Sequence, residues 1–374
     1  MNFNPALRYE EEMKRQIVGL VRVVIAVLLL IWIGTLPAIA QTIIENPDKP
    51  LAKNAGRVVK LQEVWRITDE AGQFYFKYPG ALSTSSDGHL FLADENELLK
   101  FTPDGKFIKN LFKKGQGPGE IESDFAYWIH DNEIFIYDFM TIKIIQTDLN
   151  GELIKQTKIN SGPYNGFYGI SKDSLVFSKD VFPTPAERKS RLQDMPCSIR
   201  LVSEDVKVDK ECYVFQRQMF FHPNGMTSWT RWYSVLSEDG NRLYVSHTRD
   251  YLIEALDLNK GRVVNRFKRE YPSVKYKERG WEPDFYKKFN VSKIRYEIDI
   301  AGLFINKNFL WVRTSTSDKE KGDLFDVFDS QGRFIDDFYL GAGRTLLNPY
   351  GGTVFVLEKD QAENYRLIKY KIVE

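Results

Sequence analysis

The chain has 374 residues, of which 43% are hydrophobic, 14% aromatic and 28% charged. This composition is typical of a globular protein with a large core and excludes an intrinsically disordered chain. With 52 Lys and Arg against 51 Asp and Glu, no global positive charge favours nucleic acid as a partner. The 26 Phe, 19 Tyr and 25 Gly suit an all-β protein with many turns.

The first 40 residues have the pattern of a secretory signal peptide. Basic residues precede an entirely apolar run at Val23–Ile33, and Ala38-Ile39-Ala40 then supplies the small-x-small pattern of a cleavage site. We therefore expect a periplasmic or extracellular protein whose mature chain begins near Gln41. The segment 41–57 is then expected to be a linker.

A membrane anchor is the alternative for the same segment. Ile17–Ile33 is just long enough for a marginal span, although Arg22 interrupts it. If it stays uncleaved, this segment is the only expected contact with a membrane. Met13 is an alternative start to Met1, because it gives the cleaner basic opening Met-Lys-Arg.

A short unit recurs six times along the chain, an apolar–aromatic–apolar strand that follows a tight turn. The copies are His89–Asp94, Glu133–Asp138, Ser174–Lys179, Arg242–His247, Phe309–Thr314 and Thr353–Glu358. Another short apolar strand precedes each copy, and in most units two more strands follow around a Gly or Asp turn. Six units of four strands predict a six-bladed β-propeller of four-stranded antiparallel blades over residues 58–374.

The last of these units is one strand short. After Thr353–Glu358 the chain has room for only one more strand, Tyr365–Ile372. The segment Val58–Ile67 precedes the first unit and has the composition of a strand. We expect it to complete the last blade and close the ring, which removes an open sheet edge.

The loop between the first two units carries a recognisable pattern. It contains Gly115, Gly117, Pro118, Gly119 and Glu120. This loop resembles the Gly-x-Gly-Pro-Gly-Glu signature of a family of exported bacterial six-bladed propellers, and the blade pattern resembles NHL-type and TolB-like propellers. The resemblance implies architecture and export, but no activity. From the residues themselves, we expect the glycines to permit a tight crossing between blades through positive φ angles.

Three long insertions are expected on one face of the propeller: residues 182–196, 215–231 and 268–299. Connections between second and third strands lie on the same side of an antiparallel blade as the links between blades. Binding functions gather on loops that a rigid scaffold displays, so this insertion-bearing face is the candidate site. The alternative is that the loops only pack over the mouth of the channel.

Two sets of candidate ligand-binding residues follow. The first lies in the insertions and consists of Arg217, Trp229, Arg231, Trp281 and Tyr286. The second ends the second strands around the channel mouth and consists of Asp94, Asp138, Lys179, His247, Thr314 and Glu358. Aromatic rings beside arginines suit sugars, peptides or carboxylated ligands. The alternatives are that the aromatic residues form the small core of a cap, and that the ring residues form blade-to-blade hydrogen bonds.

The two cysteines are predicted to face each other across a hairpin of the third blade. With strands Ser198–Val202 and Lys207–Cys212, Cys197 lies directly opposite Cys212. Such a pair would oxidise in an exported chain. Closing a loop of about 15 residues would stabilise the fold by roughly 3 kcal/mol. A one-residue error in register would instead leave two unpaired thiols.

No catalytic pattern is evident in the sequence, which has no Gly-x-Ser-x-Gly elbow and no His-Glu-x-x-His motif. We therefore expect a binding propeller without catalytic residues or an evident cofactor, with a peptide, glycan or protein as its partner. The alternative is a divalent-metal-dependent hydrolase, lactonase or lyase. In that case Asp94, Asp138, Glu358 and Asn96 are the candidate calcium ligands.

Overall fold

The computed structural model of the chain describes residues 43–68, 72, 74–184, 192–222, 225–278, 280 and 282–373. The signal-peptide segment 1–40, with its alternative anchor and both candidate start residues, lies outside the described residues, as does Trp281. No helix in the described part of the chain is long and apolar enough to cross a membrane.

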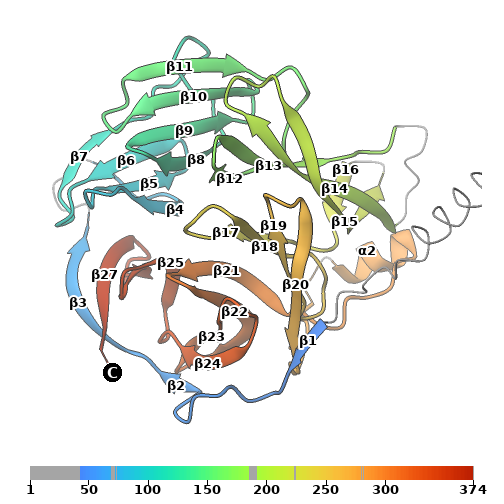
Figure 1. Cartoon of the computed structure of the whole chain (residues 1–374). Coiled ribbons are helices and arrows are strands. Elements are labelled where there is room, and N and C mark those ends of the chain that lie inside the picture. Colours follow the sequence, from blue (N-terminus) through green and yellow to red (C-terminus); the bar gives the residue numbers. More distant parts are fainter. Residues whose placement is uncertain are drawn as a thin grey trace, which may run out of the picture. The chain divides into compact units, whose positions relative to one another are not determined.

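Six antiparallel sheets stand in a ring, which confirms the predicted six-bladed β-propeller (Figure 1). Blade 1 consists of β4 (Pro79–Thr84), β5 (Leu90–Asp94), β6 (Glu97–Phe101) and β7 (Phe107–Asn110). Blade 2 consists of β8 (Phe125–His130), β9 (Glu133–Asp138), β10 (Lys143–Asp148) and β11 (Leu153–Lys158). Blade 3 consists of β12 (Gly166–Ser171), β13 (Ser174–Asp180), β14 (Leu192–Ser203), β15 (Asp209–His222) and β16 (Gly225–Ser228).

The second half of the ring repeats this plan. Blade 4 consists of β17 (Tyr233–Leu236), β18 (Arg242–Ser246), β19 (Ile253–Asp257) and β20 (Arg262–Arg269). Blade 5 consists of β21 (Ile300–Asn306), β22 (Phe309–Asp318), β23 (Gly322–Phe328) and β24 (Phe334–Tyr339). Blade 6 consists of β25 (Arg344–Tyr350), β26 (Thr353–Lys359), β27 (Tyr365–Val373) and β3 (Lys60–Ile67).

The six repeated units of the sequence form the second strand of each blade. These strands are apolar along most of their length because both of their faces are covered by neighbouring blades. The core is accordingly divided into one hydrophobic cluster for each pair of adjacent blades. Each blade therefore depends on two neighbours for the burial of its side chains.

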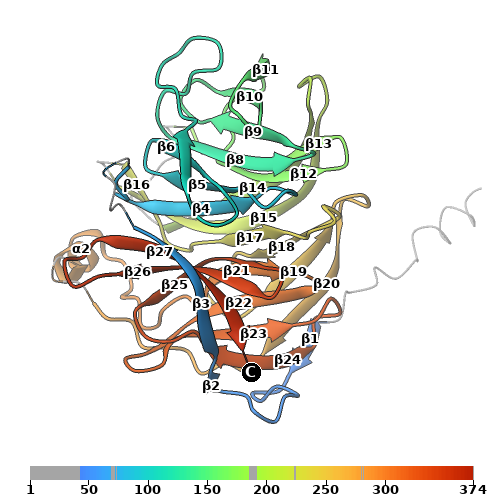
Figure 2. The same cartoon turned by 90° about the vertical axis from the view of Figure 1, so that its left-hand side faces the viewer.

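The ring closes through the strand that precedes the first blade. β3 pairs antiparallel with β27, and Ile67 stands opposite Leu367 (Figure 2). This pairing confirms the predicted closure of the last blade. The strand is shorter than predicted, because Arg57 and Val58 form a separate strand, β2, that belongs to blade 5.

The segment predicted to be a linker, 41–57, is largely built into the propeller instead. β1 (Ile43–Asn46) pairs in parallel with β20, and β2 (Arg57–Val58) pairs in parallel with β24 (Figure 1). The Asn46 side chain donates to the carbonyls of Lys268 and Gly332 and accepts from the amide of Phe334. Outer strands of two and four residues carry no detectable alternation of apolar and polar positions, so the linker prediction was wrong.

The predicted disulfide is also wrong, because the register of the hairpin differs. Cys197 pairs with Phe215 across the β14–β15 ladder, and a bulge between Ile199 and Arg200 adds a residue. Cys212 lies three residues before Phe215, which is about 10 Å along the strand at ~3.3 Å per residue. That separation exceeds the reach of a disulfide. Both thiols are free and buried, and burial raises both of their pKa values.

Substitution in the closing strand tests how strongly the ring depends on it. Ile67 is 4% exposed within the cluster between blades 6 and 1, so Ile67→Ala should lower the free energy of unfolding by about 2–5 kcal/mol. Val64, in the same strand, is 53% exposed, and Val64→Ala should change it by less than about 0.5 kcal/mol. Equilibrium urea unfolding measures both values, and equal effects would contradict the packing described for β3.

Thiol titration tests the register of the β14–β15 hairpin. Protein unfolded in guanidinium chloride without reductant should release two thiols to Ellman's reagent, since Cys197 and Cys212 are not bonded. The native protein should react slowly, because both side chains are buried. Absence of reactive thiol in the unfolded, unreduced chain would show that the two residues are paired after all.

Candidate functional site

The three insertions take different forms. Residues 182–196 join β13 to β14 and end as the first part of β14. Residues 215–231, expected to be a loop, are largely strand: β15 continues to His222 and the chain returns as β16, so blade 3 carries a long hairpin. Residues 268–299 contain the helix α2 (Glu282–Phe289) and a bridge between Lys275 and Tyr296. We call residues 215–231 and 268–299 together the cap.

Aromatic side chains join the two parts of the cap. Phe220 of β15 is fully buried, and its ring centroid lies 5.1 Å from that of Phe285 and 5.4 Å from that of Phe289. Trp229 contacts Tyr286 edge to face at 6.2 Å. Acidic residues in the first turn of α2 and lysines in its last turn complement the helix dipole. Five aromatic residues of the insertions therefore pack together in a small core of the cap.

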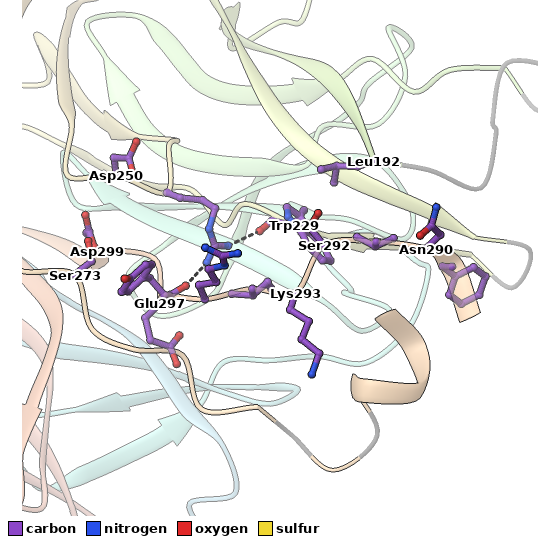
Figure 3. Close-up of a pocket in the computed structure, with 15 residues that line it drawn as sticks. Leu192, Trp229, Asp250, Ser273, Asn290, Ser292, Lys293, Glu297 and Asp299 are labelled. Carbon is purple, nitrogen blue, oxygen red and sulfur yellow. Dashed lines mark hydrogen bonds between the residues drawn. The ribbon is translucent and has the colours of Figure 1, made fainter. Parts of the chain in front are cut away.

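A cavity of about 670 Å³ lies beside the cap, and we call it the larger cavity (Figure 3). Its walls come from the cap and from two blades. They are Leu192 of β14, Trp229, Arg249 and Asp250 of the β18–β19 connection, Ser273, and residues 289–297 with Asp299. All three insertions thus contribute to one hollow, together with a short connection of blade 4.

Arg249 holds this hollow together. Its Nη1 donates to the carbonyl of Trp229 at 3.1 Å and its Nη2 donates to the carbonyl of Tyr296 (Figure 3). The amide of Asp299 donates to the Arg249 carbonyl at 2.9 Å. One arginine from blade 4 therefore ties both parts of the cap to the propeller. Within the described residues it forms no ion pair.

Acidic side chains gather at one side of the larger cavity. Asp250, Asp299 and Ser273 lie close to one another there (Figure 3). Asp299 is buried, and this burial raises the pKa of its carboxyl, although the Ser273 side chain and the Tyr251 amide donate hydrogen bonds to it. Lys293 pairs with Glu278 at 3.0 Å. The cavity therefore offers both hydrogen-bond acceptors and cations.

A second hollow of about 400 Å³, the smaller pocket, adjoins the first. It shares Trp229, Arg249, Ile294 and Glu297 with the larger cavity. Its remaining walls include Arg231, Lys277 and Tyr286, and the first residues of the innermost strands β17 and β21. The smaller pocket thus lies between the cap and the inner strands of blades 4 and 5.

The first set of predicted residues is only partly brought together. Trp229, Arg231 and Tyr286 line the smaller pocket. Arg217 does not: its Nη2 forms a 2.8 Å ion pair with Asp180 inside blade 3, where the Asp180 side chain is buried and that of Arg217 is 13% exposed. The Nε of Arg217 and the Oδ1 of Asp180 are buried there with no hydrogen-bond partner among the described residues.

The second set, the ring of second-strand ends, holds the blades and their links together. Asp94 and Asp138 are both fully buried. Asp94 accepts hydrogen bonds from the amides of Lys77 and Tyr78, and Asp138 accepts from the amides of Glu122, Met140 and Thr141. The Lys179 ammonium donates to the Ser161 carbonyl, Thr314 donates to the Leu324 carbonyl, and Glu358 accepts from Arg344 and Tyr370.

None of these ring residues lines the larger cavity or the smaller pocket. Among the described residues, no three His, Cys, Asp or Glu side chains come close enough to hold a metal ion.

His247, the remaining ring residue, belongs to a polar cluster at the joint of blades 3 and 4. Its Nδ1 lies 3.2 Å from the Gln216 carbonyl and its Nε2 lies 3.2 Å from Glu254. Tyr213 and Arg266 also donate to this carboxylate. Burial by itself would raise the pKa of Glu254, but the three donors together lower it to about 2.

The signature loop between blades 1 and 2 is held by its own glutamate. The amide of Gly117 donates to the Glu120 carboxylate at 2.8 Å, and a Cβ at Gly115 would collide with that carboxylate. Gly115 and Gly119 have positive φ, as expected for a tight crossing. The buried Lys143 donates to the Gly117 carbonyl at 3.1 Å. These contacts tie the loop to blade 2.

Sequence reasoning missed the charged residues that matter most to the two hollows. Arg249 and Asp250 lie in a connection of only a few residues, so segment length did not single them out. Their connection is the second of blade 4, and the face rule used for the insertions also applies to it. Applied to every second connection, this rule would have placed Arg249 and Asp250 on the same face as the insertions.

The Glu254 cluster gives a stability prediction with a defined pH range. A pKa lowered from its usual 4.5 to about 2 corresponds to about 3 kcal/mol of stability. That stability is present above pH 4.5 and is lost as pH falls from about 4.5 to about 2. Glu254→Gln should therefore unfold more easily at pH 7, and its difference from the wild type should shrink in that range.

Urea unfolding between pH 7 and pH 2 measures this difference. Glu152→Gln is the matched control, because Glu152 is exposed and its carboxylate makes no contact with another side chain in the described part of the chain. A constant difference between Glu254→Gln and the wild type across the pH range would contradict the assigned cluster.

Comparisons with known proteins agree with the fold. A family model described as a 6-bladed beta-propeller matches residues 73–214. No curated protein matches the chain. A Bacteroides fragilis protein assigned as exported has a similar structure, with a TM-score of 0.57, 11% identity, and coverage of 89% of this chain and 100% of that one. A DUF4221-family member from Bacteroides vulgatus gives a TM-score of 0.52 at 13% identity, covering 85% and 99%.

A gluconolactonase from Xanthomonas campestris is more distant, with a TM-score of 0.47 and 13% identity over 85% of this chain and 99% of that one. Together with the strand order, the family model and the first two structures show that the chain is a six-bladed β-propeller.

Proposed function

We propose that the chain is an exported binding protein that holds a peptide, glycan or protein segment in the larger cavity and the smaller pocket. Export is supported by the signal-peptide pattern of residues 1–40 and by the assignment of the similar Bacteroides fragilis protein as exported. Binding is supported by the way in which the two hollows are built.

The observation that carries the proposal is the convergence of distant segments on one site. Leu192, Trp229, Arg249, Ser273 and Asp299 come from five separate parts of the chain, and all of them line the larger cavity. A scaffold of six interlocked blades holds these parts in place, which is the arrangement in which loops carry recognition. Volumes of about 670 and 400 Å³ lie within the ~300–1,000 Å³ of typical ligand sites.

Trp229 is the side chain best placed to contact a ligand. It is half-buried, lines both hollows and is fixed by Tyr286 and by the bond from Arg249 to its carbonyl. A rigid indole loses little conformational entropy on binding and offers a large apolar face. The charged groups around it can orient a bound ligand through hydrogen bonds, so the site combines an apolar contact with polar contacts.

The metal-dependent hydrolase alternative receives no specific support from the described residues. Its candidate ligands Asp94, Asp138 and Glu358 each accept hydrogen bonds within the blades or their adjoining links. A calcium ion would have to compete with these bonds. We therefore propose binding, and no catalytic residue is assigned.

Substitution of Trp229 tests the proposed site. Trp229→Ala should weaken binding of ligands found on glycan and peptide arrays by at least about tenfold, because it removes the shared wall of both hollows. Tyr350→Ala is the matched control: Tyr350 is 43% exposed and is the last residue of β25, next to the first connection of blade 6 on the opposite face. Calorimetry measures the affinities, and thermal unfolding checks that both variants are folded.

A ligand that binds Trp229→Ala as tightly as the wild type would contradict the site. Loss of binding in Tyr350→Ala alone would move the site to the opposite face of the propeller.

A further inference from the structure

From the charges around the two hollows we infer that the ligand is an acidic sugar, with its carboxylate in the smaller pocket and its neighbouring ring in the larger cavity. This inference rests on the proposed function and names the ligand class of the same site.

The smaller pocket is lined by three cations, Arg231, Arg249 and Lys277, and none of them forms an ion pair in the part of the chain that the structure describes. Of the three, Arg249 also lies in the field of the Asp299 carboxylate of the larger cavity. Arg231 and Lys277 are exposed, and their side chains form no hydrogen bond there. Arg249 is half-buried and uses two of its N–H groups on the carbonyls of Trp229 and Tyr296. A guanidinium has five such groups, so donors remain for a ligand.

The carboxylates of the same pocket do not balance these cations. Glu282 is 6% exposed and accepts a hydrogen bond from the Tyr276 hydroxyl at 2.7 Å, so its carboxylate is barely accessible to a ligand. Glu297 is half-buried and is shared with the larger cavity. Three cations thus stand against one accessible carboxylate. Ligand carboxylates form their strongest hydrogen bonds with guanidinium groups, which makes this pocket an anion site.

The larger cavity differs, because its carboxylates are at least as many as its cations. Its cations are Arg249, Arg295 and Lys293, of which Lys293 pairs with Glu278, and its anions are Asp250, Glu297 and Asp299. Such a lining does not favour an anion, but its carboxylates accept hydrogen bonds from neutral donors such as hydroxyl groups. Trp229 borders both hollows and presents an aromatic face between them.

A ligand that occupies both hollows therefore needs a carboxylate, several hydroxyl donors and a flat apolar ring face. A uronic acid joined to another sugar carries all three. The C-terminus of a peptide carries the carboxylate but lacks the run of hydroxyl groups. The chemistry of the two linings thus favours a sugar acid.

The test compares uronic-acid disaccharides of the galacto and gluco series with their neutral counterparts, using calorimetry on the purified protein. The acid should bind at least about tenfold more tightly than its neutral counterpart. Added salt should weaken the binding of the acid and leave the binding of the neutral sugar unchanged. Arg231→Gln should remove most of this preference without affecting the neutral sugar, whereas Arg231→Lys should keep part of it. Arg231 is chosen over Arg249 because Arg249 also holds the cap in place.

Arg262→Gln is the matched control. Arg262 is likewise exposed and has no partner among the residues that the structure describes, but it begins β20 after a third connection, on the opposite face of the same blade. It should leave the preference for the acid unchanged.

Three outcomes would overturn the inference. Equal affinity for acid and neutral sugar, lost in Trp229→Ala, would overturn the acidic ligand while the proposed site stands. Tight binding only of peptides with a free C-terminal carboxylate, and not of their amides, would overturn the sugar assignment. Binding of no sugar or peptide by the wild type would remove support from both the inference and the proposed function.

Discussion

The antiparallel pairing of β3 with β27 is the constraint on which the propeller depends. It places a segment from the beginning of the chain and one from its end in the same sheet. Because six hydrophobic clusters each lie between two adjacent blades, an open ring would expose the cluster that blades 6 and 1 share. The scaffold that carries the cap is therefore stable only as a closed circle, and the positions of Arg249 and the cap depend on that closure.

Polar residues at the blade joints form hydrogen bonds and ion pairs that hold the scaffold together. Asp94 and Asp138 bind main-chain amides of the segments that lead into their blades. At the joint of blades 4 and 5 the buried Asp326 accepts from Arg269 and Tyr251. Removing one partner of such a buried pair leaves an uncompensated charge, so these residues fix how blades sit against each other. The chemistry available to a ligand is thereby concentrated in the cap.

The repeat pattern predicted the fold well, because strands buried on both faces are apolar along most of their length. The closure of the ring by β3 was predicted because the last blade lacked one strand in the sequence. The disulfide failed for local reasons. Val202 pairs with Asp209, so the turn lies one residue later than predicted and shifts the pairing by two residues, and the bulge beside Arg200 shifts the pairing of Cys197 by one more. The site was predicted in part. Trp229 and Arg231 lay in long insertions, whereas Arg249 lay in a short connection and Arg217 found a buried partner in Asp180.

The strands β1, β2 and β3 have a consequence for how the molecule is made. They edge three successive blades, and Asn46 bonds to a residue 288 positions further along the chain. The earliest strands of the propeller thus receive their partners only when its last blades exist. Contacts so distant in sequence slow folding and prolong the exposure of unpaired edges. A chain of this design completes its outer strands late, and their partner edges stay unpaired until both segments have been made.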